Sequence, residues 1–118
     1  MRKGIFTVAA GLCAAAAALP AAAHHGWSSY DAGNLVVLEA PVLASSYGNP
    51  HGEVQIEAKG KRWVVVLAPP SRMERRGLPR EDLAVGEVVR VEGYASRVHD
   101  GEMRAERISV NGRTIELR

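Results

Sequence analysis

Short apolar segments separated by two-residue turn dipeptides place the strongest constraint on how this chain can fold. Asn111-Gly112 is the strongest of these turn signals, and Gly60-Lys61 is a second one with glycine first. Such dipeptides are typical of the tight turns that join adjacent antiparallel strands. Residues 54–59, directly before Gly60, alternate between apolar and polar side chains as a half-buried strand does. The sequence therefore predicts a domain built mostly from β-hairpins.

Two irregularities are expected within the strands. Pro41 lies inside the first strand, and because proline cannot donate a ladder hydrogen bond, we expect a bend, a bulge or an edge position there. In the fifth strand the alternation of Met103 and Ala105 changes phase before Ile108, which predicts a β-bulge near Arg107. The predicted strands are residues 35–47, 54–59, 62–67, 86–94, 102–110 and 113–117.

One short helix is predicted between the third and fourth strands. Ser71 and Glu74 have the spacing of a capping box at its start, and Gly77 is a suitable residue for its end. A helix at this place in the strand order is typical of the OB-fold, a small Greek-key barrel. The sequence therefore predicts an all-β domain with one short helix, built as an OB-like Greek-key barrel. A six-stranded β-sandwich is the alternative.

The first 23 residues have the pattern of a secretion leader. Met1-Arg2-Lys3 is positively charged, residues 4–19 are apolar, and Ala21 and Ala23 supply the small residues that signal peptidase requires. We expect cleavage after Ala23, with cleavage after Ala22 or an uncleaved membrane anchor as alternatives. The pattern predicts a secreted, periplasmic protein without a stable membrane anchor, consisting of an N-terminal arm (24–34) and a barrel domain (35–118).

Charge and cysteine content restrict the classes of function. Arg2 and Lys3 account for the formal net charge of +2, so the remaining 15 − 2 = 13 Lys and Arg balance 13 Asp and Glu. A neutral domain gives no electrostatic reason to expect nucleic-acid binding. The single cysteine, Cys13, lies in the leader. The processed chain therefore has no disulfide, no thiolate metal site and no cysteine nucleophile.

Three histidines are the candidate metal ligands. After cleavage at Ala23, His24 offers its α-amine and its ring, and His51 in the Asn49-Pro50-His51 turn is the natural third nitrogen. Three nitrogens in a plane suit Cu(II), which prefers tetragonal nitrogen and oxygen ligands. His25 could replace one of them or add a fourth. For the ligands to meet, the arm must fold back along the first strand.

Other interpretations of these residues remain open. If Ala23 is the first residue, the amine, two backbone amides and the His25 ring form a square-planar Cu(II) or Ni(II) site without His51. Alternatively, the histidine pair only influences leader processing, and Asn49-Pro50-His51 is a turn whose histidine packs against the domain. His99, beside Asp100, is interpreted as a solvated hairpin residue rather than a ligand.

The motifs along the chain resemble a family of small secreted bacterial proteins classed only as a domain of unknown function. One departure is Gly26, where the family pattern leads us to expect serine. The resemblance covers essentially all of residues 24–118 and implies the layout and the compartment, but no reaction. The matching motifs are His24-His25-Gly26, an aromatic box from Trp27 to Asp31, Asn49-Pro50-His51, Arg75-Arg76-Gly77 and Val91-Glu92-Gly93-Tyr94.

The sequence thus predicts a small non-catalytic periplasmic protein that binds copper through His24, His25 and His51. Its expected partner is a copper donor or acceptor protein of the cell envelope. The alternative is a protein-interaction module of the envelope that holds no metal. We do not expect an enzyme, because Ser28 and Ser29 lack the strand-turn-helix that holds a serine nucleophile, and about 95 residues leave little room for a substrate platform beside a copper ion.

Overall fold

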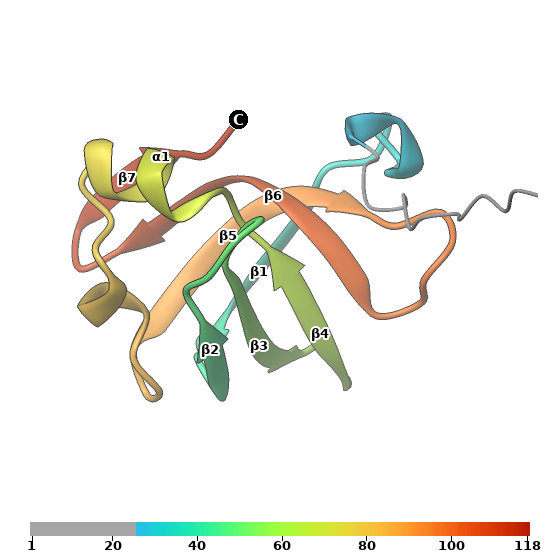
Figure 1. Ribbon diagram of the computed structural model, residues 1–118. Helices are drawn as coiled ribbons and strands as arrows, with labels where there is room; N and C mark the ends of the chain where they lie inside the picture. The colour runs from blue at the N-terminus through green and yellow to red at the C-terminus, as the bar shows by residue number, and fades with distance from the viewer. Residues whose placement is uncertain (1–25) are drawn as a thin grey trace, which may run out of the picture.

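A computed structural model describes residues 26–118, and this part of the chain folds as a strongly curled β-sheet with one α-helix (Figure 1). Two 3-10 helices, η2 (Trp27–Ser29) and η3 (Arg80–Leu83), accompany the α-helix α1 (Pro70–Arg75). The strands are β1 (Val36–Pro41), β2 (Ala44–Ser46), β3 (Glu53–Ala58), β4 (Lys61–Val66), β5 (Val88–Ala95), β6 (Glu102–Val110) and β7 (Arg113–Glu116).

The sheet order makes the domain an OB-like barrel. Hydrogen-bonded neighbours follow the order β1-β5-β6-β4-β3-β2, and β7 pairs with β6 beside this path. The pairing of β4 with β6 is parallel, and the other pairings are antiparallel. Helix α1 lies in the connection between β4 and β5. The predicted OB-like fold is confirmed, and the six-stranded sandwich is not what the chain forms.

A bend after Pro41 closes the barrel, as the sequence predicted. Only Val42 and Leu43 separate β1 from β2, which lie at opposite ends of the sheet order. The Val42 amide donates to the Glu87 carbonyl (2.9 Å), whereas the next amide, of Leu43, donates to the Gln55 carbonyl (2.8 Å). One continuous segment therefore leaves the β5 side of the barrel and joins the β3 side.

Alternating side chains from every long strand fill the barrel interior. Val54 and Ile56 of β3, and Val89 and Val91 of β5, are completely buried. Because successive side chains in a strand point to opposite faces, this period of two gives each strand one inward face. Helix α1 adds Met73 to the same core. The largest remaining core residues are Leu38, Trp63, Leu67, Leu78, Leu83, Met103, Ile108, Ile115 and Leu117.

The predicted capping box at the start of the helix is wrong. Helix α1 begins at Pro70 with Pro69 as N-cap, and no side chain caps its N-terminus. Proline is favoured at the first helical position because its φ is already helical and it has no amide to satisfy. Ser71 is consequently inside the helix, where its hydroxyl cannot take the N-cap role. The predicted end is confirmed, since Gly77 has a φ of 92°.

One hairpin turn lies one residue earlier than predicted. Ala58 pairs with Lys61, so the two central turn residues are Lys59 and Gly60, with φ values of 52° and 80°. Positive φ at both positions is the type I′ geometry, which follows the twist of the strands. The other predicted turn is confirmed: Asn111 and Gly112 have φ values of 52° and 77° between β6 and β7.

The predicted bulge in β6 is confirmed at the residue before Arg107. Glu92 pairs with Arg107, but the next residue, Gly93, pairs with Ala105, so Glu106 is the extra residue. The Glu106 carbonyl, freed from β5, accepts a hydrogen bond from the Leu117 amide (2.8 Å). Beyond the bulge, the second half of β6 pairs with β5 on one side and with β7 on the other.

Candidate functional site

The N-terminal arm is held on the hairpin formed by β5 and β6. Tyr30 forms an isolated antiparallel bridge with Ser96, directly after β5. The Asp31 amide donates to the Ala95 carbonyl, and the Arg97 amide donates to the Ser29 carbonyl, each at 2.9 Å. The arm thus continues the sheet for a few residues beyond β5. Its path is set by backbone hydrogen bonds on both sides of Tyr30.

The ring of Trp27 anchors the start of the arm. The guanidinium carbons of Arg104 and Arg118 each lie 4.4 Å from the ring centroid, which is cation–π distance. Tyr94 meets the same ring edge-on, with centroids 6.1 Å apart. These contacts come from β5, β6 and the segment after β7. Trp27 therefore joins the arm to all three of these parts of the chain.

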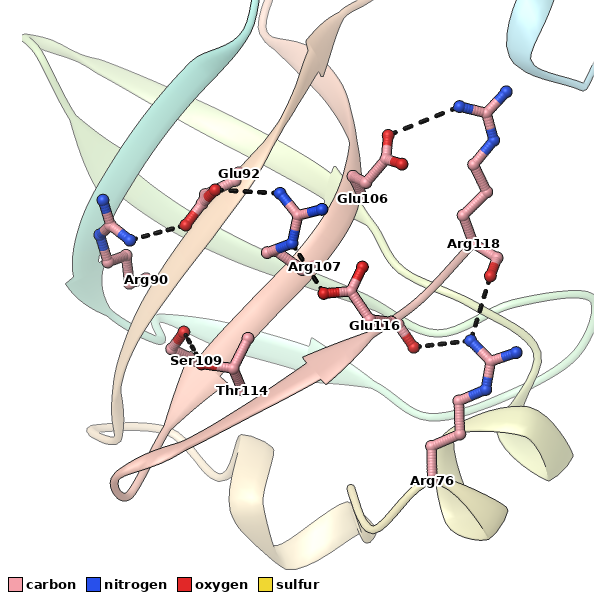
Figure 2. Close-up of polar contacts among 9 residues, drawn as sticks. All are labelled: Arg76, Arg90, Glu92, Glu106, Arg107, Ser109, Thr114, Glu116 and Arg118. Carbon is pink, nitrogen blue, oxygen red and sulfur yellow. Dashed lines mark hydrogen bonds and ion pairs between the residues drawn. The ribbon is translucent and has the colours of Figure 1, made fainter.

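Polar contacts with neighbouring residues, drawn in Figure 2, hold Arg118, whose guanidinium lies over the Trp27 ring. The Arg118 guanidinium lies 3.5 Å from the carboxylate of Glu106, the bulge residue. Arg76, directly after helix α1, donates to the carbonyls of Arg118 (3.1 Å) and Glu116 (2.8 Å). The bulge and the end of the helix therefore both position the cation that faces the arm.

A pocket of about 420 Å³ lies between the arm, the β2–β3 loop and the β5–β6 hairpin. Ionisable side chains from three separate parts of the sequence make up most of its polar lining. The residues that line it are Gly26, Ser29, Tyr30, His51, Glu53, Val66, Ser96, Val98, His99, Glu102 and Arg104.

Two of the residues that line the pocket, Tyr30 and Glu102, are joined by a hydrogen bond. The Tyr30 hydroxyl donates to the Glu102 carboxylate at 2.6 Å, and Tyr30 is only 8% exposed. Burial raises the pKa of Tyr30, and the contact with Glu102 raises it further. Tyr30 therefore keeps its proton and acts as a donor, which fixes one oxygen of Glu102.

His51 enters the pocket from the β2–β3 loop. The next residue, Gly52, is hydrogen-bonded through its amide to Ala68 and through its carbonyl to the Leu67 amide, each at 2.9 Å. Burial lowers the pKa of His51, and the positive charge of Arg104 lowers it further. The imidazole is therefore neutral at physiological pH, and a neutral ring nitrogen is the form that binds metal ions.

Of the three predicted metal ligands, only His51 belongs to the residues that the structure describes. His24 and His25 lie outside the described residues. His51 lines the pocket, and so does Gly26, which directly follows His25. Within residues 26–118, no group of three or more His, Cys, Asp or Glu side chains is placed to hold a metal ion.

Sequence reasoning missed several residues of this pocket. His99 is exposed in the β5–β6 hairpin, as its sequence pattern predicted, and it also lines the same pocket as His51. Tyr30 and Glu102 are 72 positions apart, so no local pattern could have joined them. Glu102 and Arg104 do lie on one face of a strand by their period of two. That spacing was the only available sign that both side chains leave the barrel on the same side.

A comparison with solved structures supports the fold. The chain is similar to part of the crystal structure of TiaS in complex with a tRNA and ATP, with a TM-score of 0.50 and 21% sequence identity. The match covers 71% of this chain but only 18% of the other, so the likeness concerns one small region of that protein. At this identity the comparison indicates a shared barrel fold and nothing about activity.

Sequence comparison identifies the family. No curated protein matches the chain significantly. A family of unknown function, DUF6152, matches residues 12–105, which include the arm, the pocket residues and most of the barrel. The resemblance inferred from the motifs is therefore confirmed, and the chain belongs to the DUF6152 family.

Proposed function

We propose that this is a small, non-catalytic periplasmic protein that binds a transition metal, preferably copper, through His24, His25 and His51. The proposal depends on one observation: Gly26, which directly follows His25, lines the same pocket as His51. An extended chain advances about 3.3 Å per residue, so His24 lies within roughly 7 Å of Gly26. The terminal amine and two imidazoles are therefore within reach of the pocket without any change in the described arm.

The donor atoms near the pocket favour Cu(II) over Cu(I). Cu(I) prefers soft sulfur ligands. Met73 and Met103 are completely buried in the barrel core, and residues 26–118 contain no cysteine. The pocket instead offers the neutral imidazole of His51 and the carboxylates of Glu53 and Glu102. Nitrogen and oxygen donors of this kind suit Cu(II), which a copper donor or acceptor protein of the cell envelope would exchange with this site.

Removal of the leader is a necessary step in this proposal. Cleavage after Ala23 makes His24 the first residue, so that its α-amine and ring nitrogen can bind the same ion. The reference pKa of an α-amine is roughly 7.7–8.0, so protons compete only weakly for this ligand at neutral pH. The proposed periplasmic location and the proposed metal site therefore depend on the same processing event.

The test is a Cu(II) titration of protein whose first residue is verified as His24 by mass spectrometry. Competition with a chelator gives the dissociation constant, and EPR reports the nitrogen ligands. Two matched variants are measured beside it: one with three glycines before His24, which separates the amine from this residue and leaves no histidine in the third position, and His51→Gln. We expect both variants to bind Cu(II) at least tenfold more weakly, on the order expected for a lost ligand. Equal, weak binding by all three proteins would refute the proposed site.

An exposed apolar surface supports a second candidate function, a protein-interaction module of the cell envelope. Leu43, Val85 and Val88 are 40%, 69% and 53% exposed. They lie at the bend of the barrel, where the Gly86 amide donates to the Val42 carbonyl and Val88 pairs with Pro41. Exposed apolar side chains that gather in one place are typical of protein interfaces. Serine substitutions at Leu43 and Val88 should then weaken partner binding and leave Cu(II) affinity unchanged.

A further inference from the structure

We propose that the pocket beside Tyr30 binds a small zwitterion, of the class of free amino acids and dipeptides, and that it does so without a metal ion. The inference is independent of the proposed function, because it uses only side chains of residues 26–118. The cavity measures about 420 Å³, within the range of roughly 300–1,000 Å³ that is common for small-ligand pockets. Arg104 lines it together with two carboxylates, Glu53 and Glu102.

Arg104 contributes a positive charge that no described carboxylate neutralises. Seven ion pairs join residues of the described chain, and Arg104 belongs to none of them. Its Nε atom is buried without a hydrogen-bond partner among residues 26–118. Its contact with the Trp27 ring supplies no oxygen to accept the N–H groups. Burial lowers the pKa of Arg104, as expected of a charge that lacks a counter-ion. A guanidinium matches the two oxygens of a carboxylate, so Arg104 is suited to bind a ligand carboxylate.

The two glutamates supply the opposite charge. Neither Glu53 nor Glu102 belongs to an ion pair within the described chain. The Tyr30 hydroxyl donates to one oxygen of Glu102 (2.6 Å), which leaves the other oxygen available for a ligand. Glu53 begins β3 and Glu102 begins β6, so both carboxylates extend from the ordered backbone of a strand. An ammonium group, with three N–H donors, is the ligand group that these carboxylates can bind.

The opposite charges face one space but do not meet. Burial lowers the pKa of His51, and the charge of Arg104 lowers it further. The carboxylates of Glu53 and Glu102 act on the same imidazole in the opposite direction. Opposite charges that line one cavity without pairing suit a molecule that carries both, with its carboxylate toward Arg104 and its ammonium toward the glutamates. The glutamates would repel a ligand that is only anionic, and Arg104 would repel one that is only cationic.

The experiment titrates L-alanine and L-alanyl-L-alanine into the wild-type protein with chelator present. Calorimetry gives the dissociation constant, and the amide chemical shifts of His51 and Ser96 report whether the ligand occupies this pocket. We expect at least one of the two zwitterions to bind with a dissociation constant of about 1 mM or lower. The N-acetyl and the C-terminal amide derivatives each lack one charge and should bind at least about tenfold more weakly. The comparison of alanine with the dipeptide identifies the charge separation that the pocket prefers.

Two variants assign the charges of the ligand to the two sides of the pocket. Arg104→Gln should weaken binding of the zwitterion at least about tenfold, but leave the affinity for the amide derivative unchanged, because that derivative has no carboxylate. Glu53→Gln should also weaken binding of the zwitterion, but leave the affinity for the N-acetyl derivative unchanged. Arg62→Gln is the matched control, since Arg62 is exposed and donates to Gln55 outside this pocket (2.9 Å).

The contrary results are distinct. Binding of neither zwitterion at about 10 mM, or equal binding of the zwitterions and their one-charge derivatives, would refute the ligand class. Wild-type affinity of Arg104→Gln would refute the role of this arginine. If loss of the Trp27 contact unfolds Arg104→Gln, then Glu53→Gln and the ligand derivatives still decide the question. A failure of copper binding leaves the result unaffected, because chelator is present in every titration.

Discussion

At the scale of single residues, Gly93 is the described glycine that lies closest to a neighbouring backbone. A Cβ atom at this position would lie 2.0 Å from the Arg104 carbonyl oxygen and 2.7 Å from the Ala105 Cα. Gly93 is the residue that faces the Glu106 bulge, where β5 and β6 change register. Real side chains cannot approach backbone atoms this closely, so the bulge and the glycine depend on each other.

We therefore expect Gly93→Ala to destabilise the domain by about 3 kcal/mol, because the strands must separate to admit a methyl group. Urea denaturation followed by tryptophan fluorescence measures the change. Gly48→Ala is the matched control, since nothing lies within 4 Å of a Cβ at that position. Equal stability of the two alanine variants would mean that the tight contact between β5 and β6 is not required.

The environment of His51 predicts that acid destabilises the metal-free protein. Burial and the charge of Arg104 lower the pKa of His51 in the folded state, whereas the unfolded chain keeps a pKa near 6.5. The unfolded chain then binds the proton at higher pH, so the stabilising effect is complete above about pH 6.5 and is lost as the pH falls through the folded-state value.

Denaturation of the wild type and of His51→Gln between about pH 5 and 7.5, with chelator present, measures this effect. The stability difference between the two proteins should shrink as the pH falls, because glutamine does not titrate. A difference that is constant across the range would contradict the assignment.

The separate residues of the site were predictable to different degrees. His51 stood out because Asn49-Pro50-His51 is a local motif. The pairing of Tyr30 with Glu102 was not predictable, because it depends on the arm meeting the β5–β6 hairpin. The interpretation of His99 as a solvated hairpin residue agrees with its exposed position, but only the folded sheet shows that it also lines the pocket.

At the scale of elements, the two type I′ turns differ in how well their sequences suit them. Both have positive φ at the first central residue, which is Lys59 in one turn and Asn111 in the other. Asparagine adopts this conformation readily, whereas a long side chain is strained there by roughly 1–2 kcal/mol. This strain is also why the first turn was predicted one residue too late, with glycine in the place that Lys59 occupies.

We expect Lys59→Asn to stabilise the domain by about 1 kcal/mol. The reciprocal change, Asn111→Lys, should destabilise it by a similar amount, because it introduces the same strain in the other hairpin. Thermal unfolding of the two variants and the wild type provides the comparison. The opposite order of stability would show that side-chain contacts, rather than turn geometry, determine the preference at these positions.

The elements themselves followed from local patterns, whereas their exact starts did not. The alternation of apolar and polar side chains predicted the longer strands, and the change in phase of this alternation predicted the bulge at Glu106. The helix start was displaced because Pro69 and Pro70 provide a helical beginning without a side-chain cap. The sequence predicted a bend at Pro41 but not that β1 and β2 are separate strands. Their separation depends on barrel closure, which pairs β1 with β5 and β2 with β3.

At the scale of the whole molecule, the arm and the segment after β7 meet at one ring. Trp27 contacts Arg104 and Arg118 at equal distances, and Arg118 is in turn held by Glu106 and Arg76. Both ends of the described chain are thus fastened to the same side of the hairpin sheet. The aromatic residues of the arm predict from the sequence alone that it is anchored, but only the fold shows which cationic side chains contact the Trp27 ring.

We expect Trp27→Ala to destabilise the protein by about 2 kcal/mol, as two cation–π contacts are lost together with apolar burial. The arm should also become sensitive to limited proteolysis, and Cu(II) affinity should fall because the terminal ligands are no longer held near the pocket. Trp27→Phe retains an aromatic face and should show smaller effects. Rapid cleavage of the wild-type arm would contradict the anchoring role of Trp27.

The contacts of Trp27 also determine when during synthesis the arm can be anchored. Ribosomes release a polypeptide from its N-terminus, so Trp27 emerges well before Arg104 and Arg118 exist. Until β6 and the residues after β7 have been made, the indole has no cationic partner and the arm has no hairpin to join. The anchor at Trp27 is consequently completed only after Arg118 has been synthesised.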